Sequence, residues 1–79
     1  MASPKENAKL LLKTLVDRGC KAGDYIQNGK LQEIATEVGI YADDQDEALE
    51  FAAGELWLVK GPRPATTKLT TDGWSNGDA

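Results

Sequence analysis

The stretch LWLVKGPRPATTKLT, residues 56–70, decides the fold of this chain. Its two ends, residues 56–60 and 66–70, are rich in apolar and β-branched side chains, which is typical of β-strands. Between them, residues 61–65 contain two prolines, and a proline cannot donate to a strand ladder. We therefore predict a two-stranded hairpin near the C-terminus, preceded by segments whose apolar residues recur at helical spacing.

The first helix is predicted over residues 4–18. Ser3, Pro4 and Glu6 match a capping box, in which Ser3 caps the helix and Glu6 reaches back to it. Apolar residues then repeat at the spacing of one helix face, and Gly19 is a natural stop. These signals make the first segment the clearest helix of the chain.

Two further helices are expected before the hairpin. The second spans residues 30–38, and the third runs from residue 43 or 44 to residue 54 or 55. Asp43 or Asp44 caps the third helix, and Asp44 with Glu47 makes a possible second capping box. The sequence thus predicts three helices followed by a hairpin, an α+β arrangement.

The remaining segments connect or follow these elements. One very short strand is expected near residues 25–26, between the first two helices. Residues 71–74 read as a turn, with Trp74 folding back as a lid. Residues 75–79 have nothing to bury and are expected to be frayed. We therefore expect one domain over residues 1–74 with a flexible C-terminal tail.

The composition excludes several classes of protein. The chain has 79 residues, of which 41% are apolar and 28% charged, so it allows one small globular domain. No stretch approaches the roughly 20 apolar residues of a membrane span. No signal peptide is evident at the N-terminus, and the single cysteine cannot form an internal disulfide. We expect a cytoplasmic location.

No catalytic, cofactor-binding or metal site is expected. The chain has no histidine, so Cys20 has neither a histidine to activate it nor a second cysteine. The acidic run that starts at Asp44 fails as a calcium loop because Leu49 stands where glycine is required. The GKL at residues 29–31 is not a phosphate loop, since Leu31 replaces the serine or threonine. A binding module is therefore expected rather than an enzyme.

The net charge of −4 is unevenly distributed along the chain. Residues 1–42 carry six basic and five acidic side chains, and residues 59–79 carry three basic and two acidic ones. Residues 43–58 carry six acidic side chains and no basic one. Most of the chain is therefore weakly basic, and the deficit lies in the predicted third helix.

The order of elements resembles that of winged helix-turn-helix domains from small bacterial or phage regulators. The IATEVGI at residues 34–40 is similar to the second helix and turn of such domains. The WLV at residues 57–59 and the KLTTDG at residues 68–73 are similar to the wing, whose second strand ends in Leu-Thr-x-x-Gly. The resemblance covers about residues 4–74. It implies a three-helix fold with a C-terminal two-stranded wing, and DNA binding in a regulatory role.

The charge of the third helix departs from that family. In its DNA-binding members, the start of the third helix enters the major groove. Here that start reads Asp-Asp-Gln-Asp-Glu at residues 43–47. Acidic residues in a first turn stabilise a helix by about 0.3–1 kcal/mol each, but they repel DNA phosphates. The resemblance therefore implies an atypical reader that needs basic residues elsewhere.

Two basic groups supply candidate contacts to double-stranded DNA. One lies on the predicted wing, where Arg63 stands at the tip of a stiff loop between prolines. The other is a ridge of lysines on the first helix, extended at the start of the second helix. Gln45 is the candidate base reader of the third helix. The basic candidates are Lys60, Arg63 and Lys68 on the wing, and Lys5, Lys9, Lys13 and Lys30 on the helices.

A protein-interaction module on the same fold is the second hypothesis. The acidic third helix would meet a basic protein, or aromatic side chains would form a dimer patch with a second copy. The candidates are Asp43, Asp44, Asp46, Glu47, Glu50, Phe51 and Trp57. Trp57 either packs beneath the first helix or the tail, or lies in an exposed patch. The other aromatic residues, Tyr25, Tyr41 and Trp74 together with Phe51, are expected at the edge of the core.

The position of the lysines separates the two hypotheses. If the lysines of the first helix and of the wing gather on one face away from the third helix, DNA binding is favoured. If they scatter, the interaction module is favoured.

Overall fold

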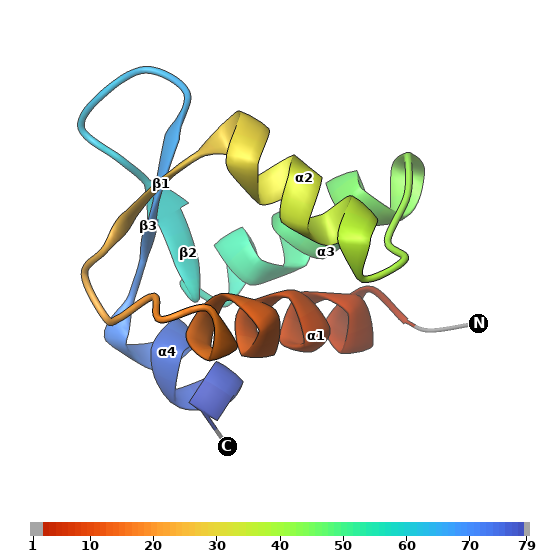
Figure 1. Cartoon of the computed structure of the whole chain (residues 1–79), viewed down its shortest axis with the longest axis horizontal. Coiled ribbons are helices and arrows are strands. Elements are labelled where there is room, and N and C mark those ends of the chain that lie inside the picture. Colours follow the sequence, from red (N-terminus) through yellow and green to blue (C-terminus); the bar gives the residue numbers. More distant parts are fainter. Residues whose placement is uncertain (1–2, 79) are drawn as a thin grey trace.

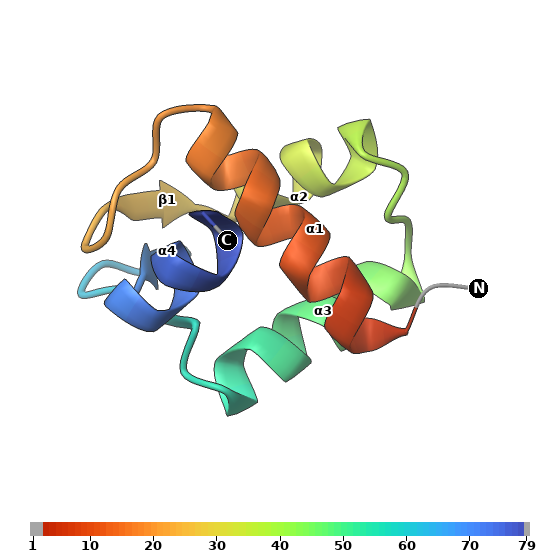
Figure 2. The same cartoon turned by 90° about the horizontal axis from the view of Figure 1, so that it is seen from below.

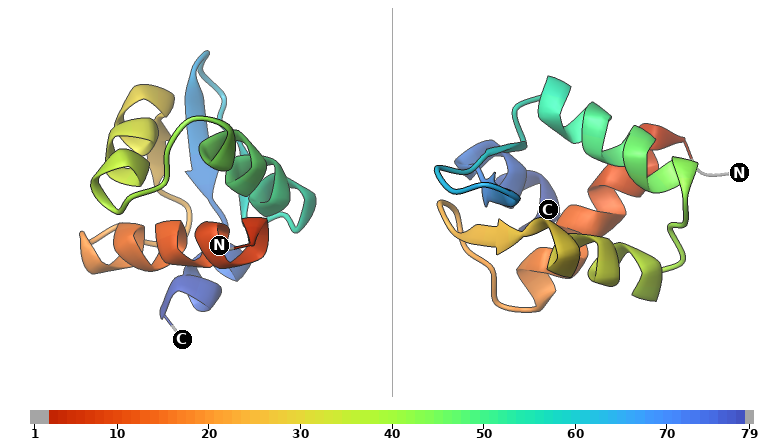
Figure 3. Two further views of the ribbon diagram at one scale, coloured as in Figure 1. Left: turned by 90° about the vertical axis from the view of Figure 1, so that its right-hand side faces the viewer. Right: turned by 90° about the horizontal axis from the view of Figure 1, so that it is seen from above.

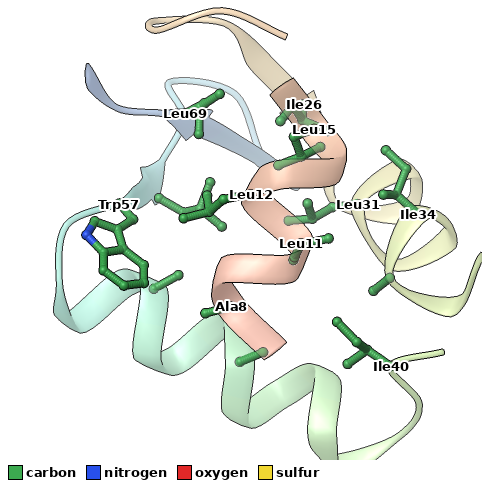
Figure 4. Close-up of a cluster of buried hydrophobic side chains, with 14 residues drawn as sticks. Ala8, Leu11, Leu12, Leu15, Ile26, Leu31, Ile34, Ile40, Trp57 and Leu69 are labelled. Carbon is green, nitrogen blue, oxygen red and sulfur yellow. The ribbon is translucent and has the colours of Figure 1, made fainter. Parts of the chain in front are cut away.

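Helix α1 (Pro4–Asp17) is the element around which the core forms. The structure is a computed structural model that describes residues 3–78. The predicted cap is confirmed, because the Ser3 Oγ accepts a hydrogen bond from the Glu6 N–H at 3.2 Å. Leu11, Leu12 and Leu15 are completely buried (Figure 4). The apolar face read from the sequence is thus the face that packs.

Helices α2 (Asn28–Glu37) and α3 (Asp43–Gly54) follow, joined by a tight turn. Gly39 has a φ of 87°, a conformation that glycine adopts without strain, and it ends α2 as predicted. The N-cap of α3 is Ala42, which has no capping side chain. The prediction that Asp43 or Asp44 caps this helix is therefore wrong. Both lie inside the first turn, where a carboxylate favours the helix dipole.

Three short strands form one antiparallel sheet, β1 (Tyr25–Gln27), β2 (Leu58–Lys60) and β3 (Thr66–Leu69), in the order β1-β3-β2. Tyr25 lies opposite Lys68, and Gln27 lies opposite Thr66. The three longer helices lie on one side of the sheet (Figures 1 and 3). The other side, which carries Tyr25 and Gln27, is the outer face of the sheet.

A fourth helix, α4 (Thr71–Asp78), occupies the part of the chain for which a turn and a frayed tail were expected. The Thr70 Oγ1 caps it by accepting from the Gly73 N–H at 3.0 Å. Helix α4 lies beside α1 (Figure 2). A Cβ added at Gly77 would lie 2.6 Å from the carbonyl oxygen of Leu12. The expected tail is therefore wrong for residues 75–78, and residue 79 lies outside the described residues.

The aromatic residues divide into buried and exposed positions. Trp57 is only 7% exposed, and its ring centroid lies 5.6 Å from that of half-buried Phe51, so the packed alternative for Trp57 is confirmed. Tyr25 and Tyr41 are 57% and 60% exposed, which contradicts their expected place at the edge of the core. Trp74 is half-buried against the core, as expected.

The α+β class and the order of the first six elements are confirmed. The structure adds one helix at the C-terminal end, and it shows that the predicted short strand near residues 25–26 pairs with the second strand of the hairpin. Leu56, which was expected to begin the first strand of the hairpin, is instead exposed in the connection between α3 and β2, with a φ of 60°.

Candidate nucleic-acid interface

The loop at residues 61–65 projects from the sheet and is braced by hydrogen bonds (Figure 1). The Gly61 N–H donates to the carbonyl oxygen of Thr66 at 3.0 Å. The Thr66 hydroxyl donates to the carbonyl oxygen of Arg63 at 2.6 Å. The exposed Arg63 side chain therefore rises from a loop with a defined shape.

The same loop is tied to the start of α2. The Asn28 N–H donates to the carbonyl oxygen of Ala65 at 2.8 Å. The Thr67 hydroxyl donates to the Asn28 side-chain oxygen at 2.6 Å. These bonds hold the first turn of α2, with the exposed Lys30, next to the hairpin (Figure 1).

Two hollows adjoin the hairpin loop, and a third adjoins the start of α2. Lys60 lines the first, of about 350 Å³, between α2, α3 and the hairpin. Arg63 lines the second, of about 400 Å³, between β1 and the loop. Arg18 and Lys30 line the third, of about 390 Å³, on the other flank of β1. No acidic residue lines any of the three. We call the surface defined by Arg18, Lys30, Lys60 and Arg63 the wing end.

Two of these four cations have carboxylate partners. Arg18 pairs with Glu37, and the Lys30 Nζ lies 3.9 Å from a carboxylate oxygen of Glu33. Such solvent-exposed pairs contribute at most about 1 kcal/mol, so a phosphate can compete for either cation. Lys60 and Arg63 have no ion-pair partner among the side chains of residues 3–77. The charge of the wing end is therefore available to an anionic ligand.

The lysines predicted on the first helix do not join the wing end. Lys5, Lys9 and Lys13 are exposed on α1, which lies along the opposite side of the molecule from residues 61–65 (Figure 1). Lys68 is half-buried on the outer face of the sheet, opposite Tyr25. The two predicted basic groups thus lie on separate surfaces, an outcome that by the criterion stated for the sequence favours the interaction module, and only Lys30 adds to the wing.

The start of α3 differs from the wing end in both charge and hydrogen bonding. Its acidic side chains are exposed, namely Asp43, Asp44, Asp46, Glu47 and Glu50. The Gln45 amide donates to the carbonyl oxygen of Ile40 at 2.7 Å and to the Thr36 hydroxyl at 3.0 Å. Gln45 therefore holds the turn between α2 and α3, and its donor is occupied inside the fold.

The aromatic patch of the interaction hypothesis is not assembled from the residues proposed for it. Trp57 is buried and Phe51 is half-buried. The exposed large apolar residues are instead Leu10, Tyr25, Tyr41 and Leu56. Sequence reasoning missed Arg18 as a cation of the wing end and Tyr25 as an exposed residue of the outer face of the sheet. The alternation of Tyr25 and Gln27 about Ile26 is the sequence signal that could have predicted that both side chains lie on the outer face of β1.

Cys20 is half-buried beside the third hollow. Burial raises the pKa of its thiol, the nearby Asp24 carboxylate raises that pKa further, and Arg18 partly lowers it. The thiolate, which is the nucleophilic form, is therefore scarce at neutral pH. Among the described side chains of residues 3–77, no three cysteine or carboxylate groups lie close enough together to hold a metal ion.

None of the helices within the described part of the chain combines the length and the apolar character that crossing a membrane requires. No protein-family model matches the chain, and neither a curated protein nor a solved structure matches it.

Proposed function

We propose that this chain is a winged-helix module that binds double-stranded DNA through the wing end, in a regulatory and cytoplasmic role. The observation that carries the proposal is the placement of charge. In a chain with 13 acidic and 9 basic residues, Lys60 and Arg63 line the two hollows beside the hairpin loop, and no carboxylate lines either of them. Arg18 and Lys30 line a third hollow on the other flank of β1. The hollow at the other end of the hairpin contains Lys68 together with Asp72. Duplex DNA carries one negative charge per about 1.7 Å of its axis and attracts such a surface.

The arrangement of elements supports the same proposal. A strand precedes α2, α2 and α3 are joined by a glycine turn, and a hairpin follows α3. The hairpin and the start of α2 lie side by side, so a duplex could touch both at once (Figure 1).

Arg63 is the main contact in this proposal. A guanidinium donates two parallel hydrogen bonds to a phosphate, which an ammonium group cannot do. The braced loop limits the conformational entropy that Arg63 loses on binding. Lys30 and Lys60 add charge on the two sides of the loop.

Binding on these terms is mostly independent of sequence. Phosphate contacts orient a protein on DNA, whereas base contacts specify the site. The Gln45 donor is occupied, and the carboxylates around it repel phosphates. We therefore propose a phosphate-binding module with weak base selectivity.

The direct test is a titration of a labelled random 20-base-pair duplex at several salt concentrations, followed by fluorescence anisotropy. The slope of log affinity against log salt is about −0.9 per phosphate contact, so three or four contacts give about −3 to −4. Arg63→Ala is expected to reduce this slope by about one contact. Lys9→Ala on α1 is the matched control and should leave it unchanged. No binding at low salt, or an unchanged slope in Arg63→Ala, would refute the proposal.

Recognition of a basic protein by α3 is the competing proposal. It is supported by the exposure of all five carboxylates from Asp43 to Glu50, and by the separation of the lysines on α1 from the wing. It predicts salt-sensitive binding of a lysine-rich peptide that is lost when Asp43, Asp44 and Asp46 become asparagine. A monomeric chain that ignores such a peptide would count against it.

A further inference from the structure

The hollow between β1 and the loop of the hairpin combines three groups that suit a nucleobase. Its volume is about 400 Å³, which lies within the range of small-ligand sites. Tyr25 and Gln27 come from β1, and Pro62 and Arg63 come from the loop. The two sides are brought together because β1 pairs with β3 (Figure 1).

Tyr25 provides an exposed aromatic side chain on the outer face of the sheet. It is 57% exposed, although most of the ring area of a tyrosine is apolar. Its directly opposite neighbour on β3 is Lys68, a basic residue. Bases stack on exposed aromatic rings of this kind in single-strand-binding proteins.

Gln27 and Arg63 add polar recognition to the same hollow. Gln27 lies two residues along the strand on the same face as Tyr25, and within residues 3–77 no side-chain capping hydrogen bond joins it to the first turn of α2. An amide offers one acceptor and two donor hydrogens, which suit the edge of a base. Arg63 has no ion-pair partner in the same part of the chain, and it lines the wall formed by the loop.

We propose that this hollow binds one unpaired nucleobase, stacked on Tyr25, with Arg63 on the adjacent phosphate. The wing end would then prefer nucleic acid that contains an unpaired base over a continuous duplex. The absence of acidic residues from the hollows on both flanks of β1 favours a polyanion over other occupants. This inference rests on the proposed function, since it deepens the ligand of the same surface.

The experiment compares two labelled 20-base-pair duplexes that differ only by one unpaired thymine, together with the corresponding single strand. We expect the protein to bind the duplex with the unpaired base about tenfold more tightly than the continuous one. Tyr25→Leu should remove that preference and leave binding of the continuous duplex unchanged, whereas Tyr25→Phe should keep it. Tyr41→Leu is the matched control, because Tyr41 is 60% exposed and lies outside the hollow.

Gln27→Ala gives an independent readout if Tyr25→Leu fails to fold. Four duplexes are compared that differ only in the identity of the unpaired base. The unmodified protein should bind them with different affinities. Gln27→Ala should flatten the ranking, because the amide is the group that contacts the base edge.

The outcomes separate this inference from the proposed function. Equal affinity for the two duplexes overturns the inference and leaves the proposed function intact. Equal loss of both affinities in Tyr25→Leu also overturns the inference, because Tyr25 would then be a general contact. Binding of the single strand and of the duplex with the unpaired base, but not of the continuous duplex, supports the inference and overturns the proposed function. No binding of any of the three overturns both.

Discussion

The wing end and the start of α3 are both exposed and charged, but their charges arise from different physical needs. The carboxylates of α3 lie in or near its first turn, where they favour the helix dipole, and Gln45 between them holds the preceding turn. The cations of the wing end line hollows and have weak partners or none. The comparison shows that a net charge of −4 describes neither surface. A charged side chain that has no structural role indicates a binding surface better than the net charge of the chain does.

The largest expected effect comes from reversing the charge at the tip of the wing. Arg63→Glu should lower affinity for a duplex about 10- to 100-fold at low salt, because it removes one phosphate contact and adds a repulsive charge. Arg63→Lys keeps the charge and should lose far less. Anisotropy titrations measure both. A loss of affinity below threefold in Arg63→Glu would show that the wing end does not contact DNA. The contrast drawn between the wing end and the start of α3 would then be wrong.

Gln45 tests whether the start of α3 is structural. Gln45→Ala should lower the free energy of unfolding by about 1–2 kcal/mol, because the side chain makes two hydrogen bonds across the α2–α3 turn. Its affinity for a duplex should not change. Urea denaturation and anisotropy give the two values. A normal stability with a weakened affinity would mark Gln45 as a base reader instead.

Neutralising the acidic surface tests the comparison from the other side. The triple variant Asp43→Asn, Asp44→Asn and Asp46→Asn should be about 1 kcal/mol less stable, since it removes the favourable interaction with the helix dipole. Its affinity for a duplex should rise by less than threefold at 0.15 M salt, where exposed charges more than about 8 Å apart are largely screened. A tenfold rise would place DNA against α3.

The smallest effect is expected on α1. Replacing Lys5, Lys9 and Lys13 by glutamine should change duplex affinity by less than about twofold, because α1 lies on the far side of the molecule from the wing loop (Figure 1). Titration at 0.15 M salt measures this change. A large loss would show that the duplex wraps around the molecule to reach α1.

Elements marked by local signals were predictable from the sequence. The cap at Ser3, the glycine turn at Gly39 and the proline loop of the hairpin each depend on residues adjacent in the chain, and each stands where it was predicted. Helix α4 was not predictable in this way, since Gly73 and Gly77 lower helix propensity. Both positions require glycine, because a side chain at Gly73 would collide with the backbone of Trp57 and one at Gly77 with the backbone of Leu12.

The candidate site was predictable only in part, for a similar reason. Arg63 and Lys60 follow from the hairpin, which is local. Tyr25 comes next to the hairpin loop through the pairing of β1 with β3, a long-range pairing between short strands that leaves little trace in the sequence. Arg18 caps the C-terminal end of α1 and pairs with Glu37 of α2, which is also a long-range contact. Burial of Ile26 then turns Tyr25 outward, against the usual preference of an aromatic side chain for the core.

Helix α2 gives the two contrasting regions a mechanical connection. Its first residue, Asn28, is fastened to the hairpin loop, and Thr36 near its other end holds the Gln45 amide at the start of α3. A ligand that tilts the hairpin must therefore break the bonds at Asn28 or carry α2 with it. In the second case, the movement of α2 also displaces the turn before α3. Binding of a ligand at the wing end would then shift the acidic start of α3.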